Sequence, residues 1–446
     1  MPFNVFSYNE LVEELFRRFP SVQKGPFQEG YKPGLERMFS FTEALGHPER
    51  QFRSIHIAGT NGKGSVANML ACALASAGLR TGLFTSPHLL DFRERMRIAA
   101  PLELISREYV YDFLTKWWPW IEENELSFFE ITTGMAFRWF ADSGVEAAVI
   151  ETGLGGRLDA TNVITPVLSV VTTIGLDHCA YLGDTLAAIA AEKAGIFKRG
   201  VPALVGETRP ETKPVFEEKA RDFCPLRFAD ARVPSLYSFA SMIVADMDLA
   251  APVQRKKNLK TVLTAVEMLQ QMPGFQALQD VPKVMVGIAH TARRMGFRGR
   301  WELLFRHPDV ICDIGHNPQA LEASFAALRG YLEKGRYSAL YVVYGVMADK
   351  DLDAIIPLMP REARWFFATP DTPRALPSSE ILLRFQAAGG SGLAFDSVPQ
   401  AVEAAMEQAQ EAGGNPLVFI GGSTFVVADA LPLFAGYNSC TEARSL

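Results

Sequence analysis

The stretch that decides the fold covers residues 55–65 and reads IHIAGTNGKGS. An apolar run ends in a glycine-rich segment, and apolar side chains then recur at helical spacing, so the order is strand, loop and helix. Glycines allow a backbone to approach phosphate oxygens with its N–H groups turned inward, and the helix N-terminus adds partial positive charge. The stretch therefore predicts a phosphate-binding loop, residues 59–65, here called the phosphate loop.

Each residue of the phosphate loop has an expected task. Lys63 supplies a mobile positive charge for the β- and γ-phosphates, and Ser65 offers a hydroxyl to Mg²⁺. The predicted phosphate contacts are Gly59, Thr60, Asn61, Gly62, Lys63, Gly64 and Ser65. Only two residues separate Gly59 from Gly62, and Gly64 lies between the lysine and the serine, so the standard Walker pattern is not matched. A plain glycine-rich turn before a helix is the alternative.

A dinucleotide-binding fingerprint is a weaker interpretation of the glycines further along the chain. Around residues 153–156 (GLGG), the position of the third required glycine holds Leu158. The G-x-G-x-x-G pattern is therefore absent there.

Composition limits the class of protein. The chain has 446 residues, room for two or three domains, and its 48% hydrophobic content excludes a disordered chain. Lys and Arg number 44 against 50 Asp and Glu, a net charge of −6, and the basic runs at 255–257 and 293–294 are short. A nucleic-acid partner would need a concentrated basic patch, so none is expected.

Cysteine usage and the N-terminal sequence indicate the compartment. Five scattered cysteines without C-x-x-C spacing predict neither disulfides nor a zinc site, and they suit a reducing compartment. The first residues lead into Glu13, Glu14, Arg17 and Arg18 without an apolar signal segment, and no uncharged stretch reaches the length of a membrane span. We expect a soluble cytoplasmic protein with no membrane partner.

Short apolar runs alternate with helix-like segments from residue 54 onward, which predicts an α/β fold with mostly parallel sheets. Expected strands are 55–58, 81–84, 147–150, 167–172 and 203–205, and a second series is 310–312, 340–344, 365–368, 393–395 and 417–420. A linker is expected near residues 293–298. We therefore predict an N-terminal domain at 1–295 and a smaller C-terminal domain at 296–446.

Polar side chains follow several of the expected strands. In open parallel sheets ligands collect at the carboxyl ends of strands, and Ser86, His88, Glu151 and the pair Asp177-His178 stand there. Hydroxyl, carboxylate and imidazole groups beside a triphosphate can hold Mg²⁺ and orient the γ-phosphoryl group. Taken singly, each histidine could be a surface or core residue, and Glu151 could be a cap or an ion-pair partner.

Two further segments have a structural and a functional interpretation. Lys193 alone is typical of a solvated lysine on a helix surface. Residues 313–318 (DIGHNP) fit a helix N-cap made by Asn317 with Pro318 in the first turn, and they also follow an expected strand.

Together these residues resemble the folylpolyglutamate synthase and dihydrofolate synthase family of the Mur-type ligases, over about residues 30–427. The resemblance rests on the order and spacing of nine blocks: 59–65 (GTNGKGS), 85–89 (TSPHL), 129–133 (FEITT), 151–162 (ETGLGGRLDATN), 177–178 (DH), 192–196 (EKAGI), 299–302 (GRWE), 313–318 (DIGHNP) and 421–424 (GGST).

The resemblance implies an N-terminal P-loop ATPase domain, a C-terminal Rossmann-like domain and an active site in the cleft between them. It implies ATP-dependent ligation of L-glutamate to dihydropteroate or a folate through an acyl phosphate, by a monomer. Catalytic roles then fall to Lys63, Lys193 and His316, and Lys193 is similar to the family lysine that becomes carbamylated. The implied metal ligands are Ser65, Ser86, Glu151 and His178. Further implied nucleotide contacts are Asn258, Arg300 and Asp313.

Two positions depart from the family pattern. Aligning the segment 252–258 (PVQRKKN) on Asn258 puts Arg255 where the family has glutamine, and Gly315 stands where alanine is common. The substrate form, the glutamate chain length and a need for a monovalent cation such as K⁺ stay open. A peptidoglycan-precursor ligase, a small-molecule kinase and a nucleotide-dependent switch are the alternatives, and a second α/β domain with Asp313 and His316 argues against a simple kinase.

Overall fold

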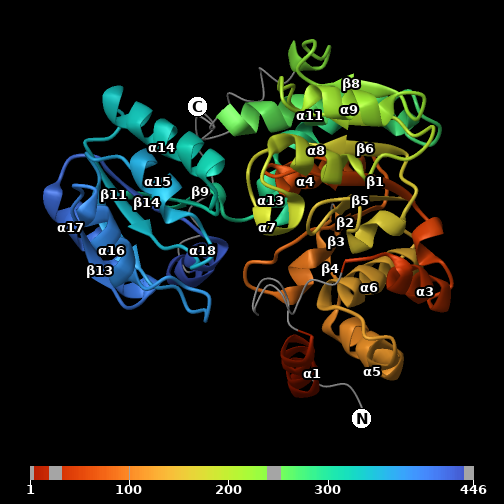
Figure 1. Cartoon of the computed structure of the whole chain (residues 1–446), viewed down its shortest axis with the longest axis horizontal. Coiled ribbons are helices and arrows are strands. Elements are labelled where there is room, and N and C mark those ends of the chain that lie inside the picture. Colours follow the sequence, from red (N-terminus) through yellow and green to blue (C-terminus); the bar gives the residue numbers. More distant parts are fainter. Residues whose placement is uncertain (1–4, 20–32, 100, 239–252, 436–446) are drawn as a thin grey trace. The chain divides into compact units, whose positions relative to one another are not determined.

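The computed structural model describes residues 5–19, 33–99, 101–238 and 253–435, with only the backbone given for 5, 6 and 253–255. The chain divides into two compact units, Met1–Phe297 and Arg298–Leu446. Each unit is built on its own sheet (Figure 1).

The first unit contains an eight-stranded sheet in the order β4-β3-β2-β5-β1-β6-β7-β8. The strands are β1 (Arg53–Ala58), β2 (Thr81–Phe84), β3 (Met96–Ala99), β4 (Glu103–Leu104), β5 (Ala147–Glu151), β6 (Leu168–Val171), β7 (Ala203–Val205) and β8 (Leu226–Phe228). All neighbours from β2 to β8 run parallel, whereas β3 is antiparallel to both β2 and β4.

Helices cover both faces of this sheet, as a parallel sheet requires. They are α1 (Val5–Arg18), α3 (Glu36–Ala44), α4 (Lys63–Ser76), α5 (Arg107–Glu123), α6 (Phe128–Asp142), α7 (Cys179–Leu182), α8 (Leu186–Ala194), α9 (Lys213–Ala220), α11 (Val253–Leu269), α12 (Val281–Ala289) and α13 (Thr291–Met295). Short 3₁₀ turns lie at Pro48–Arg50, Phe92–Arg95, Ala160–Val163 and Gln276–Gln279.

Alternating side chains of β5 belong to two different hydrophobic clusters of the first unit. Val149 packs with α4, α11 and α12, while Ala148 and Ile150 pack with α3, α5 and α6. The helix after the phosphate loop, α4, has nine consecutive buried residues, because α12 covers the side that faces away from the sheet. Such burial fixes the helix start, and with it the phosphate loop, against the sheet.

The second unit has a six-stranded sheet in the order β13-β12-β11-β14-β10-β9, parallel except for β9, which is antiparallel to β10. Its strands are β9 (Arg300–Phe305), β10 (Asp309–Asp313), β11 (Ala339–Tyr344), β12 (Arg364–Ala368), β13 (Gly392–Phe395) and β14 (Pro416–Gly421). Its helices are α14 (Pro318–Glu333), α15 (Leu352–Ile355), α16 (Ser378–Ala387), α17 (Val398–Ala412) and α18 (Thr424–Ala430), with 3₁₀ turns at Ile356–Leu358 and Leu431–Phe434.

The predicted α/β class with two mostly parallel sheets is confirmed. All ten expected strands are present, and the prediction missed β3, β4, β8 and β9, of which β3, β4 and β9 run antiparallel. Part of the expected linker at 293–298 is the end of α13, and Phe297 is the last residue of the first unit.

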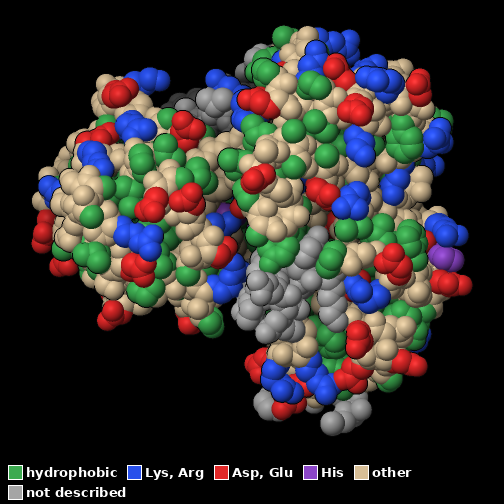
Figure 2. Space-filling view, viewed as in Figure 1, with side chains coloured by type: hydrophobic (Ala, Val, Ile, Leu, Met, Phe, Trp, Pro, Cys, Tyr) green, Lys and Arg blue, Asp and Glu red, His purple; other side chains and the backbone are tan. Residues whose placement is uncertain are grey.

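Three observations concern the helices, the surface charge and the cysteines. In the described part of the chain, no helix is long and apolar enough to cross a membrane. On the face shown in Figure 2, basic and acidic side chains of the described residues are interspersed. Cys72, Cys179, Cys224 and Cys312 are free thiols.

Candidate active site

The phosphate loop connects the end of β1 to the start of α4, and its glycines are needed for both conformation and space. Gly59 and Gly62 have φ values of 149° and 89°, which side chains with a Cβ rarely adopt. A Cβ on Gly59 would lie 1.9 Å from Thr172 Oγ1, and one on Gly62 would lie 2.4 Å from Asn258 Oδ1. The structure thus places Asn258, a predicted nucleotide contact on α11, against this loop.

The loop is anchored to the segment that follows β6. The Thr60 N–H donates to the Thr173 carbonyl at 2.7 Å, and the Thr60 hydroxyl donates to the Gly175 carbonyl at 3.1 Å. The Asn61 carbonyl accepts from the hydroxyls of Thr172 at 2.7 Å and Thr173 at 3.1 Å. These bonds within the protein fix the first half of the phosphate loop.

The Nζ atoms of two lysines meet at one carbonyl oxygen of the loop. Lys63 Nζ donates to the Gly59 oxygen at 2.9 Å and to the Thr60 oxygen at 3.4 Å. Lys193 Nζ, from α8, donates to the same Gly59 oxygen at 3.0 Å. The solvated-lysine interpretation of Lys193 is wrong, since the residue is only 4% exposed.

Burial changes the acid–base character of Lys193. Loss of water, with a smaller contribution from the Lys63 charge, lowers the pKa of Lys193 to about 7, although Asp177 and Asp159 oppose the shift. Gly156 lets the neighbouring segment approach closely, because a Cβ there would lie 2.9 Å from the carbonyl oxygen of Lys193. A large fraction of this amine is therefore neutral at pH 7.

Glu151 and Ser86 lie beside the phosphate loop at the ends of β5 and β2. The Glu151 side chain is 3% exposed, and its Oε2 accepts the Ser86 backbone N–H at 3.2 Å. The same oxygen lies 3.6 Å from the position of a Cβ on Gly64. A buried carboxylate next to a serine and the first turn of α4, which carries Ser65, is a donor set that suits Mg²⁺.

His178 lies in the segment that anchors the loop, three residues after Gly175. Its φ of 51° is left-handed, its side chain is one-third exposed, and its Nε2 lies 3.9 Å from Asp177 Oδ2. Within the described ranges, no group of three or more His, Cys, Asp or Glu side chains is placed to hold a metal ion. The structure therefore brings Glu151 and Ser86 together, while it places His178 in the segment after β6, three residues beyond the Gly175 carbonyl that holds Thr60.

Sequence reasoning missed the charged side chains that hold the 85–90 loop. The Glu94 carboxylate accepts the backbone N–H groups of Leu89 at 2.7 Å, Leu90 at 3.0 Å and Asp91 at 2.9 Å. Arg95 Nε donates to His88 Nδ1 at 2.8 Å, so this histidine is a buried structural residue. The signal in the sequence was the charged run 91–97 (DFRERMR), which alone is typical of a solvated surface.

In the second unit, Asp313 organises the turn after β10. Its carboxylate accepts the N–H groups of Trp301 at 3.0 Å and Gly315 at 2.8 Å, and Arg300 is its register partner on β9. His316 Nδ1 lies 3.1 Å from the Ile314 oxygen.

The N-cap interpretation of the DIGHNP segment is confirmed, because the Asn317 side chain accepts the Ala320 N–H at 3.0 Å. In the altered block, the side chains of Gln254 and Arg255 lie outside the described residues.

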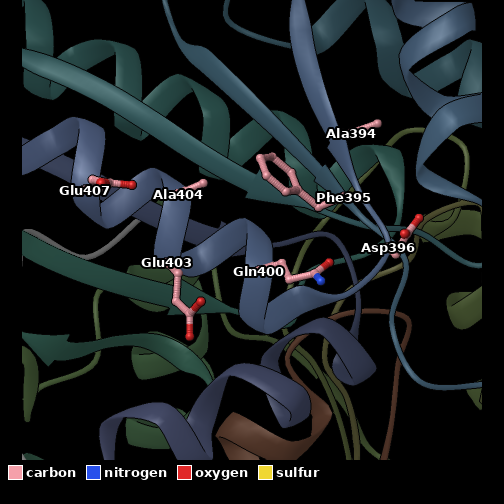
Figure 3. A pocket seen from close by; sticks show the side chains of 7 residues that line it. All are labelled: Ala394, Phe395, Asp396, Gln400, Glu403, Ala404 and Glu407. Carbon is pink, nitrogen blue, oxygen red and sulfur yellow. The ribbon is translucent and has the colours of Figure 1, made fainter.

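A cavity of about 470 Å³ in the second unit does not coincide with any predicted site residue. Figure 3 shows Glu403 and Glu407 on α17, and Phe395 and Asp396 at the end of β13. The residues that line this cavity are Ala394, Phe395, Asp396, Gln400, Glu403, Ala404 and Glu407. Three carboxylates would repel phosphates, so this cavity is unsuited to a nucleotide.

Comparison with known proteins gives matches along most of the chain. Residues 57–205 match the Mur ligase middle domain, and residues 299–424 match the Mur ligase glutamate ligase domain. Dihydrofolate synthase/folylpolyglutamate synthase of Bacillus subtilis is 32% identical over 429 residues, covering 91% of this chain and 96% of the relative.

Solved structures agree. Folylpolyglutamate synthase of Mycobacterium tuberculosis complexed with ADP aligns with a TM-score of 0.80 at 27% identity, covering 97% of this chain and 99% of that one. The bifunctional folylpolyglutamate synthase/dihydrofolate synthase of Yersinia pestis, complexed with AMPPNP and a Mn ion, aligns with a TM-score of 0.78 at 25% identity and the same coverage.

Proposed function

Because the chain belongs to the folylpolyglutamate synthase/dihydrofolate synthase family of Mur ligases, we propose that it is an ATP-dependent ligase that joins L-glutamate to dihydropteroate, to folates or to both. The products are the lengthened acid, ADP and phosphate. The observation that carries this function is the phosphate loop, which has Lys63 and Lys193 on one carbonyl and the Glu151–Ser86 pair beside Gly64.

The chemistry requires activation of the acid, because a carboxylate is a poor electrophile in water. ATP converts the carboxylate to an acyl phosphate, the glutamate amine attacks the acyl carbon, and phosphate leaves. In this scheme Lys63 exchanges the Gly59 and Thr60 carbonyls for phosphate oxygens and balances the charge that develops on the transferred group. The N–H groups of the loop hold the remaining oxygens.

A divalent metal fits the donor set. Ser65, Ser86, Glu151 and His178 are the residues that would hold it, and Mg²⁺ bound there would neutralise phosphate charge. The buried Glu151 carboxylate supports this assignment, since it supplies a negatively charged oxygen donor next to the phosphate loop. The Mn ion and AMPPNP in the Yersinia pestis relative give independent support for a nucleotide with a divalent metal.

Lys193 is proposed to act as its carbamate. A neutral amine attacks carbon dioxide, an N–C bond forms, and a proton is released, which leaves a carboxylate in place of an ammonium. A pKa of about 7 supplies the neutral amine at physiological pH. A carbamate beside Lys63 would also replace repulsion between two cations with attraction. A requirement for K⁺ is a separate question for titration.

The proposal also covers the other nucleotide contacts, the compartment and the oligomeric state. Asn258 would contact the nucleotide from its place against Gly62. Arg300 and Asp313 are assigned to nucleotide binding, and His316 to the vicinity of nucleotide and incoming glutamate. The free thiols of the described cysteines suit the cytoplasm, and we expect a monomer, which light scattering would test.

The decisive experiment measures ADP release by the purified protein with each substrate omitted in turn. ADP and phosphate should appear only when glutamate and a pteroate or folate acid are both present. A panel of dihydropteroate, monoglutamyl folate and polyglutamyl folates, with product masses as the readout, distinguishes the first addition from later ones. ATP hydrolysis that ignores both substrates would contradict the proposal.

A further inference from the structure

Arg97 on β3 is a buried arginine that joins two distant parts of the first unit. It is 5% exposed, Nη1 donates to the Met295 carbonyl at 2.8 Å, and Nη2 donates to Thr85 Oγ1 at 3.0 Å. Its Nε has no partner among the described residues. The orientation of the guanidinium group is therefore set by these two contacts.

One contact holds the 85–90 loop. Thr85 begins this loop, and its own N–H donates to the Arg95 carbonyl at 3.0 Å. The next residue, Ser86, donates its N–H to the Glu151 carboxylate. A displacement of Thr85 would therefore move Ser86 relative to Glu151.

The other contact holds the segment that leads into the second unit. Met295 ends α13, and Phe297, two residues later, is the last residue of the first unit. The Phe297 ring lies 3.8 Å from the position of a Cβ on Gly64 in the phosphate loop. The same helix is also anchored by Arg294, whose Nη1 donates to Ser76 Oγ at 2.8 Å.

An arginine suits this position better than a lysine. Its planar fork presents two donors in fixed directions, whereas a lysine has a single nitrogen that cannot span both acceptors in the same way. The buried positive charge is balanced by Glu94 and Glu151, whose fields favour the charged form although burial lowers the pKa of Arg97 to about 10. The Arg97 charge thus interacts with the Glu151 carboxylate, which also accepts the Ser86 N–H.

We propose that Arg97 is a positioning residue that holds the 85–90 loop against the 291–297 segment, so that Ser86 and Glu151 keep the geometry needed for metal–nucleotide binding. The inference rests on the proposed function, which takes these two residues as metal ligands. Arg97 would then be a common anchor for two segments: the 85–90 loop, which carries Ser86, and the 291–297 segment, which leads into the second unit.

Four single variants of the full-length protein, together with the double variant Arg97→Met/Thr85→Val, test this role. Arg97→Met removes both donors at similar length, and Thr85→Val removes only the hydroxyl with little change in shape. Arg97→Lys keeps the charge. Arg294→Met is the matched control, since it removes a different hydrogen bond of α13, the one to Ser76, and leaves both hydrogen bonds of Arg97 in place. The readouts are amide hydrogen exchange of Ser86 and of residues 88–90, and Mn²⁺ affinity in the presence of AMPPNP, measured by electron paramagnetic resonance.

Arg97→Met should speed exchange of these amides and weaken Mn²⁺ binding about 10-fold, as loss of a group that orients metal ligands does. Thr85→Val should show a smaller change in the same direction. In the Arg97→Met background it should add almost nothing, because both act on one contact. Arg97→Lys should recover part of the affinity, and Arg294→Met should match the wild type.

Wild-type exchange and Mn²⁺ affinity in both Arg97→Met and Thr85→Val would overturn the inference. So would equal effects in Arg294→Met, since they would show general loosening. If Arg97→Met does not fold, Thr85→Val and Arg97→Lys still decide the question. Failure of the wild type to bind Mn²⁺ with AMPPNP would instead count against the proposed function, and the exchange comparison would still test Arg97.

Discussion

Replacing Lys193 with Met should stabilise the folded protein near neutral pH and remove its activity. The side chain is buried, and loss of water lowers its pKa from 10.5 to about 7. This difference corresponds to a cost of about 5 kcal/mol for keeping the amine protonated inside the fold. Loss of the hydrogen bond to the Gly59 carbonyl offsets about 1–2 kcal/mol of the gain, so roughly 3 kcal/mol should remain.

The pH dependence identifies the cause. Between pH 7 and 10.5 the unfolded chain binds more protons at Lys193 than the folded chain does, so wild-type stability rises with pH in this window. Below pH 7 both states are protonated and the full cost is present. The stability advantage of the Met variant should therefore be greatest near pH 6 and shrink steadily toward pH 10.

The measurement is urea denaturation of both proteins from pH 6 to 10, in buffers stripped of carbon dioxide so that the amine stays unmodified. Lys213→Met is the matched control, because that lysine is exposed and its replacement should change the stability by no more than about 0.5 kcal/mol. Parallel curves for wild type and Lys193→Met would refute the reasoning, since they would show that Lys193 titrates alike in the folded and unfolded chains.

Three further predictions concern the site. Lys63→Ala should lower turnover by a factor on the order of 100 or more with an unchanged circular dichroism spectrum, because this lysine acts on transferred charge, and near-normal rates would remove the loop from the mechanism. His178→Ala should raise the Mg²⁺ concentration for half-maximal velocity, and an unchanged titration would show that the residue is misassigned. Gly156→Ala should lower both thermal stability and turnover, because its Cβ would lie 2.9 Å from the Lys193 carbonyl oxygen. The control is Gly330→Ala, which lies in open space on α14 and should stabilise the protein by up to about 1 kcal/mol. Equal melting temperatures for the two variants would contradict the packing argument.

The phosphate loop could be predicted because its information is local. A strand, three glycines and a buried helix follow one another within residues 53–76, so the geometry is set by near neighbours. The meeting of polar residues at the strand ends could also be predicted, because parallel strands bring their carboxyl ends to one edge of the sheet. Glu151 and Ser86 do meet at that edge. The N-cap at Asn317 followed from the same kind of short-range pattern.

Contacts between distant residues could not be predicted from the residues alone. Lys193 and Gly59 are 134 positions apart, and nothing in the sequence around Lys193 indicates that its amine is buried. Arg97 stands in a charged run typical of a surface, and its burial depends on the antiparallel strand β3, which the alternating pattern did not reveal. Long-range burial of a charge depends on which partners the fold supplies.

The hydrogen bonds between Thr60, Asn61 and the segment after β6 have a consequence for protein engineering. A nucleotide-binding element transplanted from this chain into another scaffold would have to include residues 172–175 together with residues 59–65. A graft of the glycine segment alone would leave its polar groups without their acceptors and donors, at about 1–3 kcal/mol for each one that stays buried. The smallest portable module is thus discontinuous in the gene.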